Sequence, residues 1–252
     1  MESKYNPKVS IVMATYNSSR TVLTALKSIK KQTYKNIELV VVDGKSLDST
    51  VQIVEDWDFD NKIIISEKDR GIFDALNKGV KVATGDYIFV LGSDDELLPN
   101  GIKSLVDNSH GYDIVYGDAQ CKFSNGTLVD FKAKDYHCLN HIICCSHQAM
   151  IMTKKSIEEG GYFNLNYPLR ADFALMQKVY LLGYKFKKIE SVICYFAPDG
   201  AGSKAKWTDD FERYRIIRDN KASKFPFIIF AVDELKVFIR KYIYNPNRKT
   251  KI

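Results

Sequence analysis

The chain has 252 residues, of which 45% are hydrophobic and 27% charged. This balance predicts a folded protein with one large domain, with or without an appendage, and argues against intrinsic disorder. No segment approaches the roughly 20 apolar residues that span a bilayer, and the start MESKYNPKVS is too polar for a signal peptide. The five cysteines show no CxxC spacing, so we expect a cytoplasmic protein with reduced thiols.

The net charge of +6 is concentrated at the C-terminal end of the chain. Residues 221–252 hold eight basic and two acidic side chains, whereas residues 1–220 hold 29 of each. A core without net charge argues against nucleic-acid binding. Apolar residues from Ile228 to Ile243 recur at helical spacing, which predicts a basic amphipathic helix. Such a helix lies on an anionic membrane, or it packs against the rest of the chain or a second copy in a homodimer.

The first hundred residues alternate apolar runs with amphipathic helical patterns. We expect strands at residues 9–14, 37–43, 62–67 and 86–95, and helices at residues 21–29, 49–57 and 71–83. This alternation predicts βαβ units and a mostly parallel sheet, and therefore an α/β fold. The second half is less regular. It predicts a strand at residues 112–116, a hairpin around residues 124–126 and a helix at residues 173–182 that ends at Gly183.

Polar side chains stand where the predicted strands end, at the edge where open parallel sheets bind ligands. They are Thr15, Tyr16, Asn17, Asp43, Asp69, Asp94 and Asp95. Two nucleotide-binding motifs are excluded at this edge. The GKS of VVVDGKSLDST has Leu39 where a P-loop needs its first glycine, and TYNSSR has no glycine for a dinucleotide site.

These side chains suit a nucleotide diphosphate. Tyr16 offers an aromatic face to a base, and Asp43 offers an acceptor to a base N–H or a ribose hydroxyl. Asp94 and Asp95 offer hard oxygen ligands to Mg²⁺ or Mn²⁺ beside a diphosphate. Each residue alone also has an ordinary explanation, since an Asp pair commonly caps a turn and a tyrosine at a strand end commonly packs in the core.

The order and spacing of these elements resemble the inverting nucleotide-sugar glycosyltransferases of glycosyltransferase family 2, which have the GT-A fold. The resemblance covers about four fifths of the chain and rests on VSIVMATYN (9–17), SIKKQTYKNIELVVVDGKSLDST (28–50), EKDRGIFDALNKGVKVATGDYIFVLGSDDEL (67–97) and ADFALMQKVYLLGY (171–184). It implies a Rossmann-like sheet flanked by helices over residues 1–203, with a nucleotide-binding half (1–100) and an acceptor half (101–203). Residues 204–252 would form a basic helical extension.

The resemblance also implies roles for individual residues. The nucleotide would contact Thr15, Tyr16, Asn17, Asp43, Asp69, Arg70, Lys78 and Asp94. A Mn²⁺ or Mg²⁺ ion would rest on Asp95, Asp172 would be the catalytic base, and His147 with Gln148 would lie on the acceptor side. Two positions depart from the family pattern, because Gly92 replaces the first acid of Asp-x-Asp-Asp and Ala171 replaces the acid before the base. Arg70 and Lys78 are equally explained as a solvated helix face, and Asp172 as a helix cap.

The segment HCLNHIICCSH (137–147) allows a second interpretation, because its histidines and cysteines could bind zinc. It lacks a CxxC frame, and its apolar centre favours a buried segment.

The sequence therefore predicts a hexosyltransferase at the inner face of the membrane or in the cytoplasm. A sugar would pass, with inversion, from a nucleotide diphosphate sugar, with UDP as the expected carrier, to a hydroxyl of a growing bacterial surface glycan or lipid-linked glycan. A non-catalytic sugar-nucleotide-binding protein and a nucleotidyltransferase are the alternatives. The latter would normally show a glycine-rich, basic phosphate loop, which the N-terminus lacks.

Overall fold

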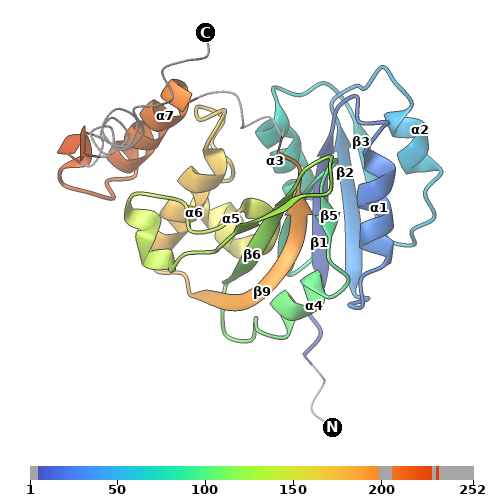
Figure 1. Cartoon of the computed structure of the whole chain (residues 1–252), viewed down its shortest axis with the longest axis horizontal. Helices are drawn as coiled ribbons and strands as arrows, with labels where there is room; N and C mark the ends of the chain where they lie inside the picture. Colours follow the sequence, from blue (N-terminus) through green and yellow to red (C-terminus); the bar gives the residue numbers. More distant parts are fainter. Residues whose placement is uncertain (1–4, 199–205, 229–230, 233–252) are drawn as a thin grey trace.

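The computed structural model describes residues 5–198, 206–228 and 231–232 (Figure 1). Most of the helix expected at residues 228–243, and the expected domain boundary after residue 203, lie outside these ranges. Within the described residues, no helix combines the length and the apolar character needed to cross a membrane.

One sheet organises the molecule. Its first half consists of four parallel strands in the order β3-β2-β1-β4, namely β1 (Val9–Thr15), β2 (Ile37–Asp43), β3 (Lys62–Ser66) and β4 (Tyr87–Gly92). Every residue of β2 is buried, as expected of a parallel strand covered on both faces. The side chains alternate between two cores, so that Val40 and Val42 belong to one and Leu39 and Val41 to the other. The parallel sheet expected from the sequence is confirmed.

The second half of the sheet is mixed. The strand β8 (Met150–Thr153) pairs antiparallel with both β4 and β6 (Ile114–Lys122). Next to β6, β9 (Phe186–Phe196) runs parallel to it, and the short β5 (Glu96–Leu97) closes the order. The strand β7 (Leu128–Phe131) forms the expected hairpin with β6. The turn after Gly92 ends β4 earlier than the sequence pattern predicted, which frees residues 93–95 for the site.

Helices cover both faces of the sheet. The described helices are α1 (Val22–Lys30), α2 (Thr50–Glu55), α3 (Ile72–Val82), α4 (Gly101–Val106), α5 (Lys154–Gly160), α6 (Ala171–Leu181) and α7 (Lys206–Asp219), with the 3-10 turns η1 (Tyr136–Asn140) and η2 (His147–Ala149). The core that contains Phe73, Phe173 and Ile216 joins α3, α6 and α7 to one face. The other core, with Leu26 and Ile102, joins α1 and α4 to the opposite face. The helices α6 and α7 lie at the end of the molecule remote from α2 (Figure 1).

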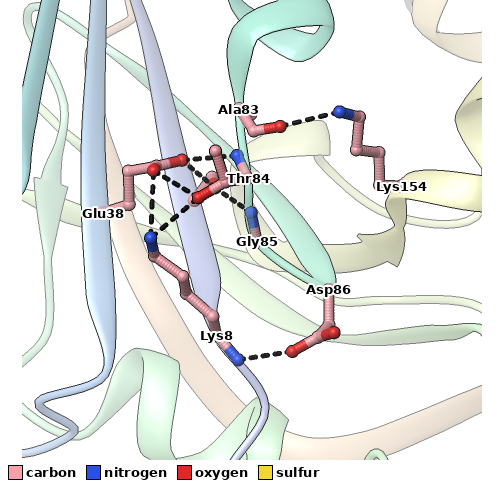
Figure 2. Close-up of polar contacts among 8 residues, drawn as sticks. Lys8, Glu38, Ala83, Thr84, Gly85, Asp86 and Lys154 are labelled. Carbon is pink, nitrogen blue, oxygen red and sulfur yellow. Dashed lines mark hydrogen bonds and ion pairs between the residues drawn. The ribbon is translucent and has the colours of Figure 1, made fainter.

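A buried carboxylate fastens the amino edge of the sheet. Glu38 on β2 accepts hydrogen bonds from Ser10 Oγ on β1 at 2.6 Å and from Thr84 N and Oγ1 before β4, at 2.8 and 2.6 Å. Lys8 Nζ lies 3.1 Å from the same carboxylate (Figure 2). Burial alone would raise the pKa of Glu38, but these donors lower it to about 2. The network joins three segments at the edge opposite the candidate site.

Candidate active site

A cavity of about 750 Å³ opens at the carboxyl edge of β1 and β4. This volume lies within the range typical of small-molecule sites. Its lining combines the two halves of the chain, because Tyr16 and Asp69 come from the first half while His147 and Asp172 come from the second. Of the residues that the sequence singled out, Thr15, Tyr16, Asp69, Asp94, Asp95, His147, Gln148 and Asp172 line this cavity.

Asp43 ties three strand ends together. Its Oδ1 accepts hydrogen bonds from Thr15 Oγ1, at 3.1 Å, and from Ser46 Oγ. Its Oδ2 accepts from Ser46 N at 2.9 Å and from Ser66 Oγ at 3.0 Å. A carboxylate offers about four lone-pair sites, so protein donors already occupy all of them. Asp43 is 1% exposed and does not line the cavity, and its contact with a base stays a prediction.

The wall beside Asp43 depends on a glycine. A Cβ atom on Gly44 would lie 2.5 Å from Asp69 Oδ2 and 3.3 Å from the ring of Tyr16. Asp69 itself accepts a hydrogen bond from Gly71 N at 2.9 Å, and Tyr16 is 62% exposed. The absence of a side chain at residue 44 therefore lets an aromatic ring and a carboxylate oxygen approach the same part of the cavity.

Asn17 has an organising role. It adopts a left-handed backbone with φ 49°, its backbone N–H donates to Ser46 Oγ at 2.8 Å, and its side-chain oxygen accepts from Leu47 N at 2.9 Å. These bonds hold the loop after β1 against the loop after β2. Asn17 does not line the cavity.

Asp94 and Asp95 occupy the turn that ends β4. Asp95 is 3% exposed, and its carboxylate accepts hydrogen bonds from Gly92 N and Ala197 N, each at 3.1 Å. Burial and the negative charge of Asp94 raise the pKa of Asp95 to about 6. A Cβ on Gly92 would lie 2.4 Å from Asp95 Oδ2 and 2.9 Å from Asp94 Oδ1. The glycine that departs from the family pattern thus makes room for both carboxylates.

This acidic turn fits a divalent cation that shares its ligands with a diphosphate. Among the described residues, the cavity lining includes no lysine or arginine, so phosphates beside Asp94 and Asp95 would meet uncompensated negative charge. No group of three or more His, Cys, Asp or Glu side chains in the described ranges could hold a metal by itself. Mg²⁺ and Mn²⁺ are commonly bound through one or two carboxylates plus substrate phosphates. Asp94 and Asp95 supply two such carboxylates.

Asp172 lies in the first turn of α6 and lines the same cavity as the acidic turn. Its Oδ2 lies 3.2 Å from His147 Nδ1, and its Oδ1 accepts from Phe173 N at 2.7 Å. Burial would raise the pKa of Asp172, but the hydrogen bond and charge of His147, the Phe173 N–H and the charge of Arg170 together lower it. Asp172 is therefore held as an ionised carboxylate in the cavity, which is the state that a general base requires.

Arg70 and Lys78 are not among the residues that line this cavity. Arg70 is paired with Asp74 at 3.2 Å, and its side chain is 77% exposed. Lys78 lies 2.8 Å from Glu67 and donates to the carbonyl of Lys68 at 2.7 Å. These ion pairs fit the solvated surface that the sequence offered as the alternative, and a contact of either residue with a diphosphate stays a prediction.

Several lining residues carry no signal in the sequence. Phe131 on β7 and Phe196 on β9 reach the cavity together, with ring centroids 5.9 Å apart at an interplanar angle of 90°. Ala197 contributes only its backbone N–H to Asp95. These contributions depend on the pairing of β6 with β7 and β9, which local sequence does not specify. A hydrogen bond from Ser93 Oγ to Ser18 Oγ, 2.9 Å long, joins the loop after β4 to the loop after β1, and local sequence does not specify this contact either.

Solved structures define the class of fold. The S. aureus TarS fragment 1-349 in complex with UDP-GlcNAc matches with a TM-score of 0.70 at 20% identity, over 97% of this chain and 76% of that one. The mannosyltransferase PcManGT of Pyrobaculum calidifontis, in complex with GDP-Man and Mn²⁺, matches with a TM-score of 0.65 at 22% identity, over 91% and 70%. The fold is the GT-A fold of glycosyltransferases.

Sequence comparison defines the family. The model of Glycosyl transferase family 2 matches residues 10–160, and the chain belongs to this family. A PGL/p-HBAD biosynthesis glycosyltransferase of Mycobacterium bovis is 32% identical over 174 residues, which are 66% of this chain and 67% of the relative. The UDP-Glc:alpha-D-GlcNAc-diphosphoundecaprenol beta-1,3-glucosyltransferase WfgD of Escherichia coli is 32% identical over 128 residues, half of each chain (50% and 51%). The protein is a glycosyltransferase, as the sequence predicted.

Proposed function

We propose that this glycosyltransferase moves a sugar from a UDP-sugar to a hydroxyl of a lipid-linked bacterial surface glycan, with inversion at the anomeric carbon. One observation carries the proposal: a single cavity holds the acidic turn of Asp94 and Asp95 and, from the other half of the chain, the ionised carboxylate of Asp172. The first group suits a diphosphate with its cation, and the second suits an attacking hydroxyl.

The donor and acceptor classes draw support from the comparisons. TarS was solved with UDP-GlcNAc, and the name of WfgD specifies a UDP-glucose donor and a diphosphoundecaprenol-linked acceptor. In this chain, the exposed ring of Tyr16 would stack on the base beside Asp69. Asp94 and Asp95 would hold Mn²⁺ or Mg²⁺, and the bound ion would neutralise charge on the diphosphate.

Asp172 would act on the acceptor in a single displacement. Its carboxylate takes the proton of the acceptor hydroxyl as the oxygen forms a bond to the anomeric carbon. The bond from that carbon to the phosphate oxygen breaks at the same time, and UDP leaves with the bonding electron pair. An α-linked donor would therefore give a β-linked product.

The test begins with the donor, because the proposal defines the acceptor only as a class of glycans and not as one compound. A panel of UDP-sugars with Mn²⁺ should include at least one that raises the melting temperature. Release of UDP is then measured for wild type and Asp172→Asn, which keeps the size of the side chain but cannot take a proton. We expect the variant to bind donor and to lose roughly 10²-fold or more in turnover. Near-normal turnover of Asp172→Asn would assign the base to another residue and refute this mechanism.

A further inference from the structure

Two adjacent residues, His147 and Gln148, lie where the two halves of the sheet meet. They belong to η2, which leads directly into β8. The strand β8 runs antiparallel to β4, with Phe89 opposite Ile151 and Tyr87 opposite Thr153. The amino end of β8 therefore lies beside the carboxyl end of β4, and η2 is brought to the edge that carries Asp95.

Each of the two side chains contacts a different carboxylate. His147 Nδ1 lies 3.2 Å from Asp172 Oδ2. Gln148 lines the same cavity as Asp95, and its side chain lowers the pKa of that carboxyl, while its own Oε1 accepts a hydrogen bond from Ser146 Oγ. Because the carboxylates accept, the donors are His147 Nδ1–H and the Gln148 amide N–H. Because Ser146 Oγ donates to the amide oxygen, the amide nitrogen is the group that remains to donate to Asp95.

We propose that His147 and Gln148 are positioning residues that form a bridge between Asp172 and Asp95. The proposal rests on the proposed function, and it adds that the base and the diphosphate side are fixed relative to each other by one short turn. Neither residue makes or breaks a bond with the sugar. His147 fixes the orientation of the Asp172 carboxylate, and Gln148 fixes that of Asp95, so that a displacement of η2 would move both groups together.

This arrangement has a physical rationale in the geometry of displacement reactions. The attacking oxygen and the leaving phosphate oxygen lie on opposite sides of one carbon, so the groups that serve them must keep a fixed separation. Misplacement by about 1 Å costs on the order of 10²-fold in rate. Asp95 is held by β4 and Asp172 by α6, elements from different halves of the chain. A bridge from η2 supplies the constraint that neither element supplies alone.

The first experiment tests the bridge without any turnover. The chain has only four histidines, so long-range ¹H–¹⁵N NMR spectra can show which ring nitrogen of each carries a proton. The spectrum of His147→Asn identifies the His147 signals by their loss. We expect a proton on His147 Nδ1, and we expect Asp172→Asn to shift the His147 signals while those of His110 stay in place. A His147 that carries its proton on Nε2 alone, or that ignores Asp172→Asn, would overturn the proposal.

The second experiment separates positioning from packing. Asn can donate from near the position of His Nδ1, whereas Ala cannot. With UDP-glucose and Mn²⁺ as the probe and water as acceptor, we expect His147→Ala to lower kcat for UDP release by about 10- to 100-fold, with the donor KM changed by no more than about twofold, and His147→Asn to keep most activity. Equal loss in both variants, or none in either, would refute the donor role. A wild type that releases no UDP would refute the proposed donor instead, and the NMR result would still decide the bridge.

A third experiment tests the interaction of Gln148 with Asp95. Gln148→Leu keeps the size of the side chain and removes the donor to Asp95. We expect the stabilisation of the protein by UDP with Mn²⁺, measured as a shift in melting temperature, to decrease, whereas His147→Ala should leave it unchanged. An unaltered shift in Gln148→Leu would remove Gln148 from the bridge.

Discussion

Glu212 on α7 accepts a hydrogen bond from the backbone N–H of Arg170 at 3.1 Å, at the residue that immediately precedes α6. The same carboxylate oxygen accepts from Leu169 N at 3.0 Å. A carboxylate in this place satisfies N–H groups at a helix start and interacts favourably with the helix dipole. The helix α7, which lies beyond the matched family region, thus supports the turn that carries Asp172.

We predict that Glu212→Ala lowers both stability and turnover. The variant leaves two N–H groups near the start of α6 without this acceptor, which should cost about 1–3 kcal/mol. Displacement of Asp172 should lower kcat for UDP release by about tenfold or more, with donor affinity kept. Thermal unfolding and kinetics check both effects. Glu190→Ala is the control, because that side chain is 81% exposed, and a Glu212 variant that matches it would contradict the prediction.

We predict that UDP binding depends on a divalent cation held by Asp95. Asp95→Asn should lower the affinity for UDP in the presence of Mn²⁺ by at least about tenfold, since loss of groups that merely support metal ligands often costs that much. Calorimetric titration with UDP, with Mn²⁺ or with EDTA, measures the effect. Glu96→Gln is the matched control, because Glu96 is adjacent in sequence but pairs with Lys122 outside the cavity. UDP affinity that EDTA leaves unchanged would exclude the cation.

We predict that Glu38 stabilises the fold in a pH-dependent way. Its folded pKa of about 2 lies below the ordinary value of 4.5, so the stabilisation is complete above about pH 4.5 and is lost as the pH falls toward 2. The shift corresponds to up to about 3 kcal/mol. Urea unfolding of wild type and Glu38→Gln should therefore differ most near neutral pH and converge in acid. A difference that stays constant down to pH 2 would show that packing, not ionisation, is responsible.

We predict that the C-terminal segment binds anionic lipid. Phe225 and Phe227 are 65% and 66% exposed, and the basic residues of 221–252 would add roughly 1 kcal/mol each near an anionic leaflet. The double variant Phe225→Ser and Phe227→Ser should co-sediment less with phosphatidylserine vesicles at low salt. Leu182→Ser, at a site that is 49% exposed on the far end of α6, is the control.

A truncation after Asn220 tests the same surface more severely. Asn220 Nδ2 donates to the carbonyl of Ala174 at 3.2 Å and to Gln177 Oε1 at 3.1 Å, so this cut keeps the contact between α7 and α6. Turnover with water as acceptor should survive while vesicle binding falls. If the full chain ignores such vesicles, or if truncation unfolds the protein, the segment packs on protein instead.

The parallel half of the sheet was predictable because its signals are local. Apolar runs such as Leu39 to Val42 alternate with helical patterns, and the structure has a strand or helix at each expected place. The acidic ends of these strands also gather at one edge, as parallel strands require. The reversal at β8 was not predictable, since the four residues of that strand resemble any short apolar run and obtain their direction from pairing with β4 and β6.

The same distinction applies to the candidate site. Residue types singled out Asp95 and the family resemblance singled out Asp172, but neither predicted the direction of the side chain. Arg70 remains a predicted partner for a diphosphate, and in the structure it pairs with Asp74 in the first turn of α3, a contact that residue type alone does not reveal. The backbone N–H of Ala197 cannot be identified from its side chain at all. The sequence therefore indicated which chemical groups to expect at this edge of the sheet, but not the contacts that they make.

The saturated carboxylate of Asp43 has a consequence for how donor preference could change. Because protein donors already order the loops that it joins, nucleotide binding need not spend free energy on ordering them. In the proposed complex Tyr16 and Asp69 would contact the base, and their exchange would leave the Asp43 network intact. If the nucleotide binds as proposed, the residues that order the loops differ from those that select the base, so a substitution at residue 69 would change the preferred nucleotide carrier without a loss of loop order.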